Sequence, residues 1–398
     1  MRNIIVTIIL SFFISSVAIS RSDRQTANST ITGYVFHDSN NNGVKDANEK
    51  GIKDVVVSDQ VNVVTTDEAG LYQIKYSSPY GILFISAPNG YHASKSFWQR
   101  VDSAREKIQI NFPLTKIASG SSFTFIHASD THVSEGSLDR MQKFRNIVDS
   151  VKPDFIVITG DLVRDALRVP EAEATRLYQL FLSEVGKITT PVWCAPGNHE
   201  LFGIERHLSL VSEKNPLYGK NMYRHYLGPD YYSFNYGGIH FVALNSLDFE
   251  DLWYYGRIDS IQLEWLKKDV ATVSSTTPIV TFQHVPFFSG GFSLMPFEED
   301  GPARSLVRER GVLQYRHVVS NAQEVMAILE HHNYPLALAG HYHFEQRFSF
   351  AGCQTRFEQT AAVVGPSEEG VIKMPSGIKV YHVNEGKIDE GKFVRLDK

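Results

Sequence analysis

The stretch Phe155-Ile-Val-Ile-Thr-Gly-Asp161 decides the fold, because an apolar strand ends there on a glycine and a carboxylate. The unbroken apolar run from Phe155 to Ile158 predicts a strand that is buried on both faces, as in a parallel sheet. Ligands of α/β proteins bind beyond the carboxyl ends of such strands. Asp161 is therefore a candidate metal ligand, placed where a carboxylate can bridge two ions.

The segments around this strand predict an α/β (α+β) domain over residues 120–398. Residues 123–126 form a second buried run, and apolar residues at helical spacing lie between the two runs until Pro153. A second helix is predicted over residues 170–186, and a third begins at the N-cap Asp259, with Gln262 three residues later. Further strands are predicted near Val192, Tyr231, Phe241, Val280 and Leu336, including a hairpin of residues 232–236 and 239–244.

Residues 31–116 have a different pattern. Short apolar runs at 55–57, 61–64 and 82–85 are separated by Gly, Pro, Asn and Asp, and no helical period intervenes. This pattern predicts a small all-β sandwich of about 85 residues, preceded by a polar linker over residues 21–30.

Residues 1–20 predict a secretory signal peptide, because Arg2 precedes an apolar run and small residues follow near Ala18–Ser20. The alternative is a membrane anchor, but the run is shorter than the ~20 residues that span a bilayer. We therefore expect no transmembrane segment in the mature chain and an exported protein, periplasmic, secreted or on the cell surface. Whether Cys194 and Cys353 pair is left open.

The overall charge restricts the class of partner. The formal net charge is −5 over 398 residues, whereas a general nucleic-acid binder would present a basic face. We therefore expect no nucleic-acid surface, and the sequence does not indicate an oligomeric state.

Polar residues with metal-binding side chains follow each predicted strand of the α/β domain. They are Asp130 and His132 after residues 123–128, Asn198 and His199 after 192–195, His284 after 279–283, and His341 and His343 after 336–339. A chance scatter would not place every one of them at a strand end. Carboxylate, amide and imidazole donors without a thiolate suit divalent Mn, Fe or Zn, and the set is large enough for two ions.

The order Asp130-x-His132, Gly160-Asp161, Gly197-Asn-His-Glu200, His284 and Gly340-His-x-His343 resembles the calcineurin-like metallophosphoesterases over residues 120–398. The resemblance implies a four-layer αββα sandwich with two metal ions. It implies that the first ion is held by Asp130, His132, Asp161 and His343. It implies that the second is held by Asp161, Asn198, His284 and His341.

The same resemblance implies a reaction. An exported binuclear enzyme of this kind would hydrolyse a phosphate mono- or diester by in-line attack of a hydroxide that bridges the metals. It implies that His199 is catalytic and protonates the leaving oxygen or stabilises the transition state. The alternative is that His199 only orients Asn198. Glu200 is expected to fix a ligating imidazole.

Two departures exclude better-known branches. Purple acid phosphatases place a tyrosine ligand where Arg164 stands and a glycine where His132 stands, so a tyrosinate-bound ferric ion is not expected. The Gly-Asp-x-Val-Asp-Arg-Gly run of protein Ser/Thr phosphatases is also absent from the sequence. Arg164 and His225 are candidate substrate contacts, and Asp165 is a candidate partner that orients His199. Surface charge is the alternative for Arg164 and Asp165.

Other segments receive weaker interpretations. The long segment 285–314 and the aromatic run 253–255 could form a cleft wall that selects the leaving group, or could be ordinary packing. His127 and His240 lie within strand patterns and are expected in the core.

Residues 38–49 fit the Asp-x-Asn-x-Asn-Gly-x5-Glu calcium-loop pattern at every specified position. The candidate calcium ligands are Asp38, Asn40, Asn42, Val44, Asp46 and Glu49. Because the loop lies between strands, it resembles the calcium loops of adhesin-type B repeats, and the domain resembles the N-terminal sandwich of metallophosphoesterases. The alternative is a polar hairpin that is closed by its own side-chain hydrogen bonds.

Two alternative functions remain open at this point. One is a surface adhesion or carbohydrate-binding protein with a degenerate phosphoesterase domain, and the other is a metallohydrolase that acts on a pyrophosphate bond. The expected substrate is a phosphorylated small molecule or a phospholipid-type molecule.

Overall fold

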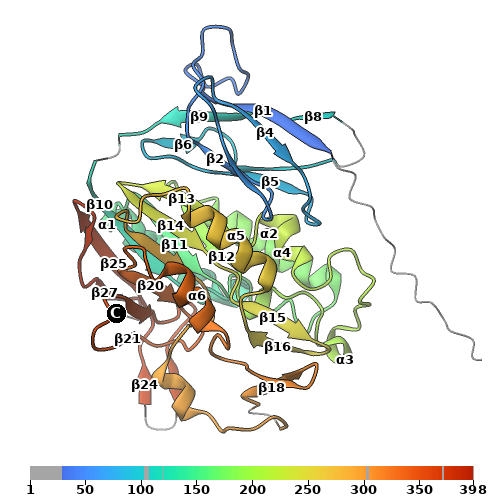
Figure 1. The fold of residues 1–398 in the computed structure, drawn as a ribbon. Helices are drawn as coiled ribbons and strands as arrows, with labels where there is room; N and C mark the ends of the chain where they lie inside the picture. The colour runs from blue at the N-terminus through green and yellow to red at the C-terminus, as the bar shows by residue number, and fades with distance from the viewer. Residues whose placement is uncertain (1–28, 103–106, 119, 302–303, 370–371, 398) are drawn as a thin grey trace, which may run out of the picture.

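The computed structural model of the protein describes residues 29–102, 107–118, 120–301, 304–369 and 372–397. The predicted signal peptide, residues 1–20, and the linker up to residue 28 lie outside the described residues. The described chain forms an all-β part that sits on a larger part of two sheets and flanking helices (Figure 1).

The all-β part consists of two sheets around one apolar core. One sheet has the order β4–β1–β9–β6, with β8 also paired to β1, and the other has the order β3–β2–β5–β7. In β4 the side chains of Tyr72 and Ile74 point inward while their neighbours are exposed, which is the two-residue period of a strand. The bounds are β1 (Thr30–His37), β2 (Val56–Ser58), β3 (Val63–Thr65), β4 (Leu71–Lys75), β5 (Ile82–Ser86), β6 (Tyr91–Ala93), β7 (Trp98–Arg100), β8 (Lys107–Gln109) and β9 (Phe112–Lys116).

The first sheet of the larger part has the order β12–β11–β10–β25–β26, with β27 paired to β25. Strands β10, β11 and β12 run parallel, so their carboxyl ends meet at one edge, and β25 is antiparallel to β10. The bounds are β10 (Ser122–Ala128), β11 (Phe155–Thr159), β12 (Val192–Ala195), β25 (Gly377–Asn384), β26 (Lys387–Ile388) and β27 (Lys392–Arg395).

The second sheet has the order β13–β14–β17–β20–β22–β21. Its four middle strands run parallel, and the predicted hairpin of β13 and β14 forms one edge. The bounds are β13 (Tyr232–Tyr236), β14 (Ile239–Ala243), β17 (Ile279–Phe282), β20 (Leu336–Ala339), β21 (Gln346–Phe348) and β22 (Arg356–Gln359). Three two-stranded ribbons complete the strands: β15 (Leu247–Glu250) with β16 (Trp253–Gly256), β18 (Leu306–Glu309) with β19 (Val312–Tyr315), and β23 (Ser367–Glu369) with β24 (Ile372–Met374).

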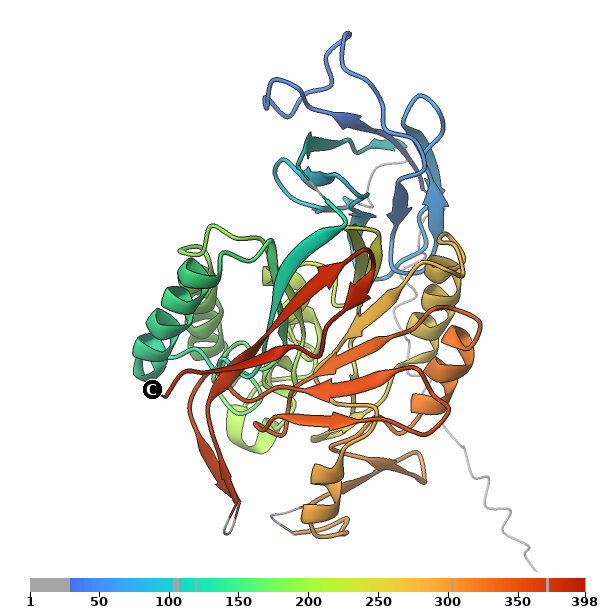
Figure 2. The same cartoon turned by 90° about the vertical axis from the view of Figure 1, so that its left-hand side faces the viewer.

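The two sheets pack face to face and carry helices on their outer faces (Figure 2). In β11 the side chain of Phe155 packs on Phe241 of the second sheet, while Ile156 points to the helices α1 and α2, as an apolar strand buried on both faces requires. Helices α5 and α6 cover the second sheet. The predicted four-layer α/β fold with an all-β part before it is confirmed. The helical bounds are η1 (Glu135–Ser137), α1 (Leu138–Val151), α2 (Glu171–Val185), η2 (Asn198–Glu200), α3 (Arg206–Ser209), α4 (Asn221–Tyr226), α5 (Ser260–Val270), η3 (Gly290–Leu294) and α6 (Ala322–Leu329).

Buried polar contacts fix the all-β part to the second sheet. Gln60 Nε2 donates a hydrogen bond to Asp230 Oδ1 at 3.1 Å, and Trp265 Nε1 of α5 donates one to Ser58 Oγ at 3.1 Å. Phe84 of β5 belongs to the same core as Trp265. A buried contact of this kind holds the two parts in one relative position.

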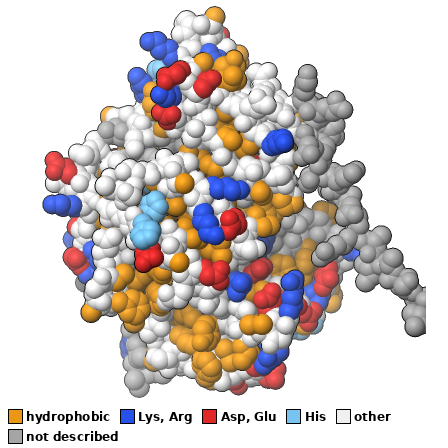
Figure 3. All heavy atoms as spheres, in the orientation of Figure 1, with side chains coloured by type: hydrophobic (Ala, Val, Ile, Leu, Met, Phe, Trp, Pro, Cys, Tyr) orange, Lys and Arg blue, Asp and Glu red, His pale blue; other side chains and the backbone are white. Residues whose placement is uncertain are grey.

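The predicted loop over residues 285–314 has secondary structure of its own, because it contains η3, β18 and most of β19. It carries exposed apolar side chains at Leu294, Phe297, Val312 and Leu313. Apolar side chains gather on the end of the molecule opposite the all-β part (Figure 3). Among the described residues, no helix has both the length and the hydropathy of a membrane span.

Candidate metal centre

The seven predicted ligand residues come together at the carboxyl ends of the parallel strands. The segments that follow four strands are joined there in pairs, because Asp130 N donates to Gly160 O at 3.0 Å and Gly340 N donates to His284 O at 3.0 Å. The glycines of the motifs make this approach possible. A Cβ on Gly160, which has a φ of +83°, would lie 2.7 Å from the backbone nitrogen of Gly197 and 2.8 Å from His284 Cβ.

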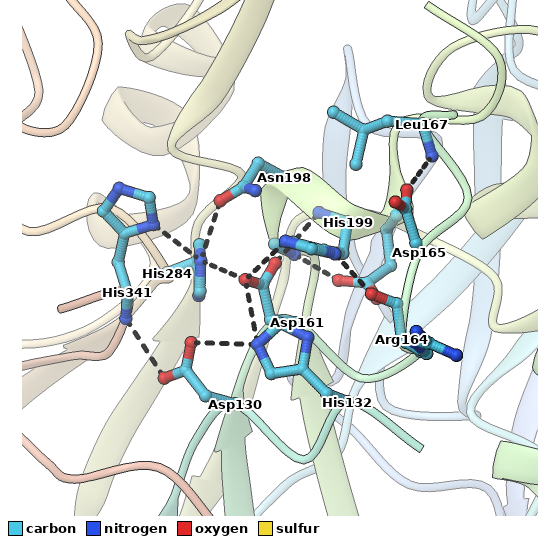
Figure 4. Close-up of polar contacts among 12 residues, drawn as sticks. Asp130, His132, Asp161, Arg164, Asp165, Leu167, Asn198, His199, His284 and His341 are labelled. Atoms are coloured by element: carbon cyan, nitrogen blue, oxygen red, sulfur yellow. Dashed lines mark hydrogen bonds and ion pairs between the residues drawn. The ribbon is translucent and has the colours of Figure 1, made fainter. Parts of the chain in front are cut away.

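Donor atoms of this cluster face one another at short range (Figure 4). Asp161 Oδ2 lies 3.2 Å from His284 Nε2 and 3.6 Å from His132 Nε2. Asp130 Oδ1 lies 3.2 Å from His343 Nε2. The donor atoms form two groups, each within 4.8 Å, of which one is Asp130, His132, Asp161 and His343 and the other is Asp161, His284 and His341. Asp161 belongs to both groups, which is the arrangement that a bridging carboxylate requires.

Asn198 completes the second group through its side-chain oxygen. Its Oδ1 lies 3.2 Å from His284 Nε2, and His341 Nδ1 lies 3.1 Å from the same nitrogen. His284 Nδ1 donates to the carbonyl of Thr159 at 2.7 Å, so in the neutral imidazole that a metal requires, Nε2 carries the lone pair and faces the cluster.

The backbone of the cluster is strained. Asp130, His132, Asp161, His341 and His343 all have positive φ, between +39° and +77°. Each such residue costs on the order of 1–3 kcal/mol and persists only where its surroundings hold it. Five of the seven candidate ligands share this strain, so the loops are shaped by the position that their side chains must take.

The electrostatics of the cluster depend on its burial. Burial would raise the pKa of Asp161, but the imidazoles of His284, His199 and His132 hold it well below its ordinary value. Burial and the neighbouring His199 lower the pKa of His132 to about 4. For His284, burial acts against the carboxylate of Asp161, which raises the pKa of His284 to about 9.

These donors fit two divalent cations. The buried Oδ1 of Asp130 accepts no hydrogen bond. Nitrogens of His132 and His343 lie 3.3 Å apart, and two imidazole lone pairs face each other at that distance only when a cation or a proton lies between them. Carboxylate, amide and imidazole donors without a cysteine suit Mn, Fe or Zn.

Comparison with known proteins identifies the family. The family model named calcineurin-like phosphoesterase matches residues 123–345, which is more than half of the 398 residues. The chain belongs to the calcineurin-like phosphoesterase family. A second model, the N-terminal domain of calcineurin-like phosphoesterases, matches residues 39–117. The predicted resemblance and the expected class of enzyme, a metal-dependent phosphoesterase, are both confirmed.

Two curated relatives have names that state an activity. A probable cyclic nucleotide phosphodiesterase of Rhodococcus erythropolis is 25% identical over 237 residues, which are 57% of this chain and 67% of the relative. The serine/threonine-protein phosphatase CPPED1 of Mus musculus is 31% identical over 140 residues, which are 34% of this chain and 41% of the relative. This phosphoesterase therefore matches less than half the length of the mouse protein.

Solved structures that superpose on this chain include two phosphatases. A dimetal phosphatase of Danio rerio gives a TM-score of 0.46 at 14% identity, over 69% of this chain and 99% of that one. A purple acid phosphatase from yellow lupin seeds gives a TM-score of 0.47 at 13% identity, over 86% of this chain and 67% of that one.

His199 lies beside the candidate ligands of the phosphoesterase but outside both donor groups. Its Nδ1 donates to the carbonyl of Arg164 at 2.5 Å, so the other ring nitrogen, Nε2, faces Asp161 Oδ2 at 3.8 Å. Its ring lies 4.5 Å from that of His132. An imidazole nitrogen that faces a group of candidate metal ligands in this way is placed for proton transfer.

Two predicted site residues, Asp165 and Arg164, do not have the positions that their predicted roles require. Asp165 does not orient His199, because its carboxylate accepts from the backbone nitrogens of Leu167 and Arg168, and the Arg164 carbonyl holds the imidazole instead (Figure 4). The Arg164 side chain is exposed and points away from the cluster (Figure 4).

Glu200 does not hold an imidazole either. Its oxygens accept from the backbone nitrogens of Leu162, Val163 and Gly197 at 2.6–3.0 Å. The carboxylate therefore ties the loop after Asp161 to the loop before Asn198, and it sets the position of both ligands through the main chain.

The structure does not bring His225 to the cluster. It lies at the exposed end of α4, where its carbonyl accepts from Arg100 at 2.6 Å and its ring packs on Tyr226. Its contacts in the described chain therefore lie between the two parts of the molecule, and the prediction of a substrate contact at His225 has no support. His127 and His240 are fully buried, as expected for core histidines.

His317 is a residue of the site that the sequence did not reveal. Its Nδ1 lies 2.7 Å from His341 Nε2, and its Nε2 lies 3.3 Å from the carbonyl of Arg304. A carbonyl only accepts, so His317 Nε2 carries the proton and its Nδ1 accepts from His341 Nε2. His341 Nδ1 is thereby left with the lone pair that faces the cluster. No motif or spacing connects His317 with the ligand blocks.

The predicted cleft wall lies beside this pair of histidines. Tyr254 packs edge-on against His341 at 6.3 Å. A cavity of about 370 Å³ adjoins His341 and His343, and Leu294 and Met295 of the segment 285–314 contribute apolar walls to it. The two segments are therefore in place for the predicted contact with a leaving group, which stays a prediction.

The predicted calcium loop is held by its own polar groups. Asp38 is buried and accepts from the backbone nitrogens of Asn42 and Gly43, and Asp46 accepts from the side-chain amides of Asn40 and Asn42. Glu49 accepts from the backbone nitrogens of Ser39 and Asp46, and Val44 donates its backbone nitrogen to Asn42. These bonds are those of the alternative, a self-closed polar hairpin, and calcium binding stays a prediction.

The two cysteines are free thiols. Cys194 is half-buried in β12, and Cys353 is exposed in the loop before β22. No disulfide joins them.

Proposed function

We propose that this protein hydrolyses phosphate mono- or diesters at a centre of two divalent metal ions. Asp130, His132, Asp161 and His343 would hold one ion, and Asp161, Asn198, His284 and His341 would hold the other. The single observation that carries this proposal is the membership of Asp161 in both donor groups. Ions in such a pair supply a nucleophile at neutral pH and neutralise charge on the phosphoryl oxygens.

The residues of the chain supply the remaining functions. In its protonated form His199 would give its Nε2 proton to the leaving oxygen, because its Nδ1–H is fixed on a carbonyl and its Nε2 faces the cluster. Glu200 and His317 keep the ligands in position through the backbone loops and through the tautomer of His341. The complete ligand set favours an enzyme over a degenerate domain with an adhesive role.

The test is a substrate panel on the full chain, reloaded with Mn, Fe or Zn after chelation. Phenyl phosphate, bis(p-nitrophenyl) phosphate, a cyclic nucleotide, a glycerophosphodiester and pyrophosphate would separate monoesterase, diesterase and pyrophosphatase. We expect turnover of an ester that depends on metal and is lost in Asp161→Asn. Turnover that is unchanged in Asp161→Asn, or a purified protein that takes up no transition metal, would contradict the proposal.

Two further properties are proposed from the sequence pattern. Residues 1–20 act as an export signal, and amino-terminal sequencing of the protein from its source would show a start near residue 21. Residues 38–49 bind calcium with the side-chain oxygens of Asp38, Asp46 and Glu49 among the ligands. Both proposals rest on the residue patterns of those segments.

A further inference from the structure

Two arginines lie beside the candidate metal centre, the buried Arg316 and the half-buried Arg304, and neither has a buried carboxylate as a partner among the described residues. Arg316 is 8% exposed, and its Nε is buried without a hydrogen-bond partner. The Nε of Arg304 is buried without a partner as well. Burying a charged group is costly unless it is paired or hydrogen-bonded, so this arrangement needs an explanation.

The ion pairs of the described chain show how unusual this is. Arg224, which is also 8% exposed, binds the buried carboxylate of Asp230 through two nitrogens, each at 2.8 Å from an oxygen. Within the described residues Arg316 forms no ion pair, and Arg304 forms one with the exposed Asp300 at 3.7 Å. The chain therefore neutralises the Arg224 guanidinium itself and leaves that of Arg316 for another anion.

Aromatic rings hold both guanidinium groups in position. The guanidinium carbon of Arg316 lies 4.3 Å from the centre of the Tyr254 ring, and that of Arg304 lies 3.9 Å from the centre of the Trp253 ring. Stacking on a ring fixes the plane of a guanidinium and leaves its N–H groups free to bind an anion. A planar fork of this kind matches the oxygens of a phosphate or a carboxylate.

The same residues are connected to the metal ligand His341. Tyr254 packs against His341 and against His317, with ring centres 6.3 and 6.1 Å apart, and His317 follows Arg316 directly in the chain. The carbonyl of Arg304 faces His317 Nε2 at 3.3 Å. An anion on the two arginines would thus lie one aromatic residue away from the ligands of the second ion.

We propose that Arg316 and Arg304 form a binding site for a second anionic group of the substrate, a phosphate or a carboxylate carried by the leaving group. This inference rests on the proposed function, because it places the scissile phosphate on the metals. The favoured substrates are then phosphoesters with two anionic groups, and esters with a neutral leaving group bind more weakly.

The test uses inhibitors whose two ends can reach both sites. The full chain is loaded with metal, and its hydrolysis of the best ester of the substrate panel is measured in the presence of alkylphosphonates, α,ω-alkanebisphosphonates or ω-carboxyalkylphosphonates with three to eight methylenes. At the spacer length that spans the two sites, we expect the second anionic group to lower the inhibition constant at least tenfold. The bisphosphonate and carboxylate series distinguish the two anions.

Variants test whether the two arginines cause the gain in inhibitor affinity that the second anionic group gives. We expect Arg316→Gln and Arg304→Gln to lose this gain and Arg316→Lys to retain part of it. Arg308→Gln is the matched control, because Arg308 is an exposed arginine of the same segment, bound to Glu299, and should retain the full gain. The readout is the ratio of two inhibition constants within one variant, so a general loss of activity cancels.

Two results would overturn the inference. One is that no spacer length lowers the inhibition constant of the wild type. The other is that the lower inhibition constant persists in Arg316→Gln, as it would if the second anionic group only removed metal from the protein. A failure of the proposed function looks different, because the metal-loaded wild type would then hydrolyse none of the monoesters and diesters of the substrate panel.

Discussion

The candidate metal centre and the polar loop 38–49 were both predicted from spaced oxygen and nitrogen donors, yet their structures differ. In the metal centre the buried Asp130 Oδ1 accepts no hydrogen bond, and histidine nitrogens face each other. In the loop, the oxygens of Asp38, Asp46 and Glu49 accept hydrogen bonds from the loop itself. One site is unsatisfied by the protein alone, and the other is satisfied without a cation.

The contrast extends to the backbone. Five candidate ligands of the metal centre have positive φ, and their loops come from strands that are far apart in the chain. The loop 38–49 is one local segment, and its positive φ values fall on Asn41 and Gly43, which are not among the candidate ligands. Strain that the whole fold maintains is a stronger indication of a binding site than a local motif, because an isolated segment would relax it.

The largest expected effect is a loss of ester hydrolysis that occurs on mutation of the metal centre and not on mutation of the loop 38–49. We expect Asp161→Asn to lower ester hydrolysis roughly a thousandfold, because the neutral amide no longer supplies charge to both ions. Asp38→Asn, the matched carboxylate-to-amide change in the loop, should leave hydrolysis within about twofold, since the loop belongs to the other part of the fold. Initial rates of hydrolysis, with metal content measured on the same samples, check both variants. Equal losses of activity in the two variants would contradict the difference between the two regions.

A second prediction concerns His199, which borders the centre without joining it. We expect His199→Gln to lower kcat by about 10²–10⁴-fold for an alkyl phosphate, because the leaving alkoxide must be protonated. The loss should be smaller for p-nitrophenyl phosphate, whose leaving group needs no proton. Two metal ions should remain bound. A loss of metal instead would show that the residue only orients Asn198.

A third prediction concerns the histidine outside the ligand motifs. We expect His317→Ala to weaken metal binding by about 10–100-fold, because His341 then loses the acceptor that fixes its tautomer. His317→Gln should recover part of this affinity, since a side-chain amide can accept from His341 and donate to Arg304. Titration with a competing chelator measures the affinity. The control is His207→Ala, whose ring packs on Trp253 outside the candidate ligand set.

The smallest expected effect tests the loop itself. Calcium at ten times its dissociation constant should stabilise the full chain by about 1.4 kcal/mol and raise its Tm by about 2 °C. Asp38→Asn should remove that shift. An unchanged Tm of the wild type at millimolar calcium would mean that the loop is a self-closed hairpin. Magnesium at the same concentration controls for ionic strength.

The ligand set could be predicted because each ligand obeys a local rule. A strand that ends in Gly160-Asp161 places its carboxylate at the sheet edge whatever lies elsewhere, and the same holds for His284 after β17. The helices α1 and α2 were likewise visible in their apolar period and in Pro153.

The partners of those ligands could not be predicted by such rules. Asp165 was expected on His199, and Glu200 on an imidazole, because neighbours in sequence were taken as neighbours in space. The structure gives the Arg164 carbonyl to His199 and three backbone nitrogens to Glu200. A side chain in a tight turn reaches whichever loop packs across it, and the sequence of the turn does not record that loop.

The sequence by itself determined the family, the layered fold and the candidate metal ligands that the fold brings together, because strand ends and glycines are local features. Only the tertiary structure decided that His317 contacts His341 and that His225 lies between the two parts. It also decided that Arg304 and Arg316 have no buried carboxylate as a partner in the described part of the chain. Those facts depend on packing between segments distant in sequence, where burial and partner geometry set the energy of each polar group.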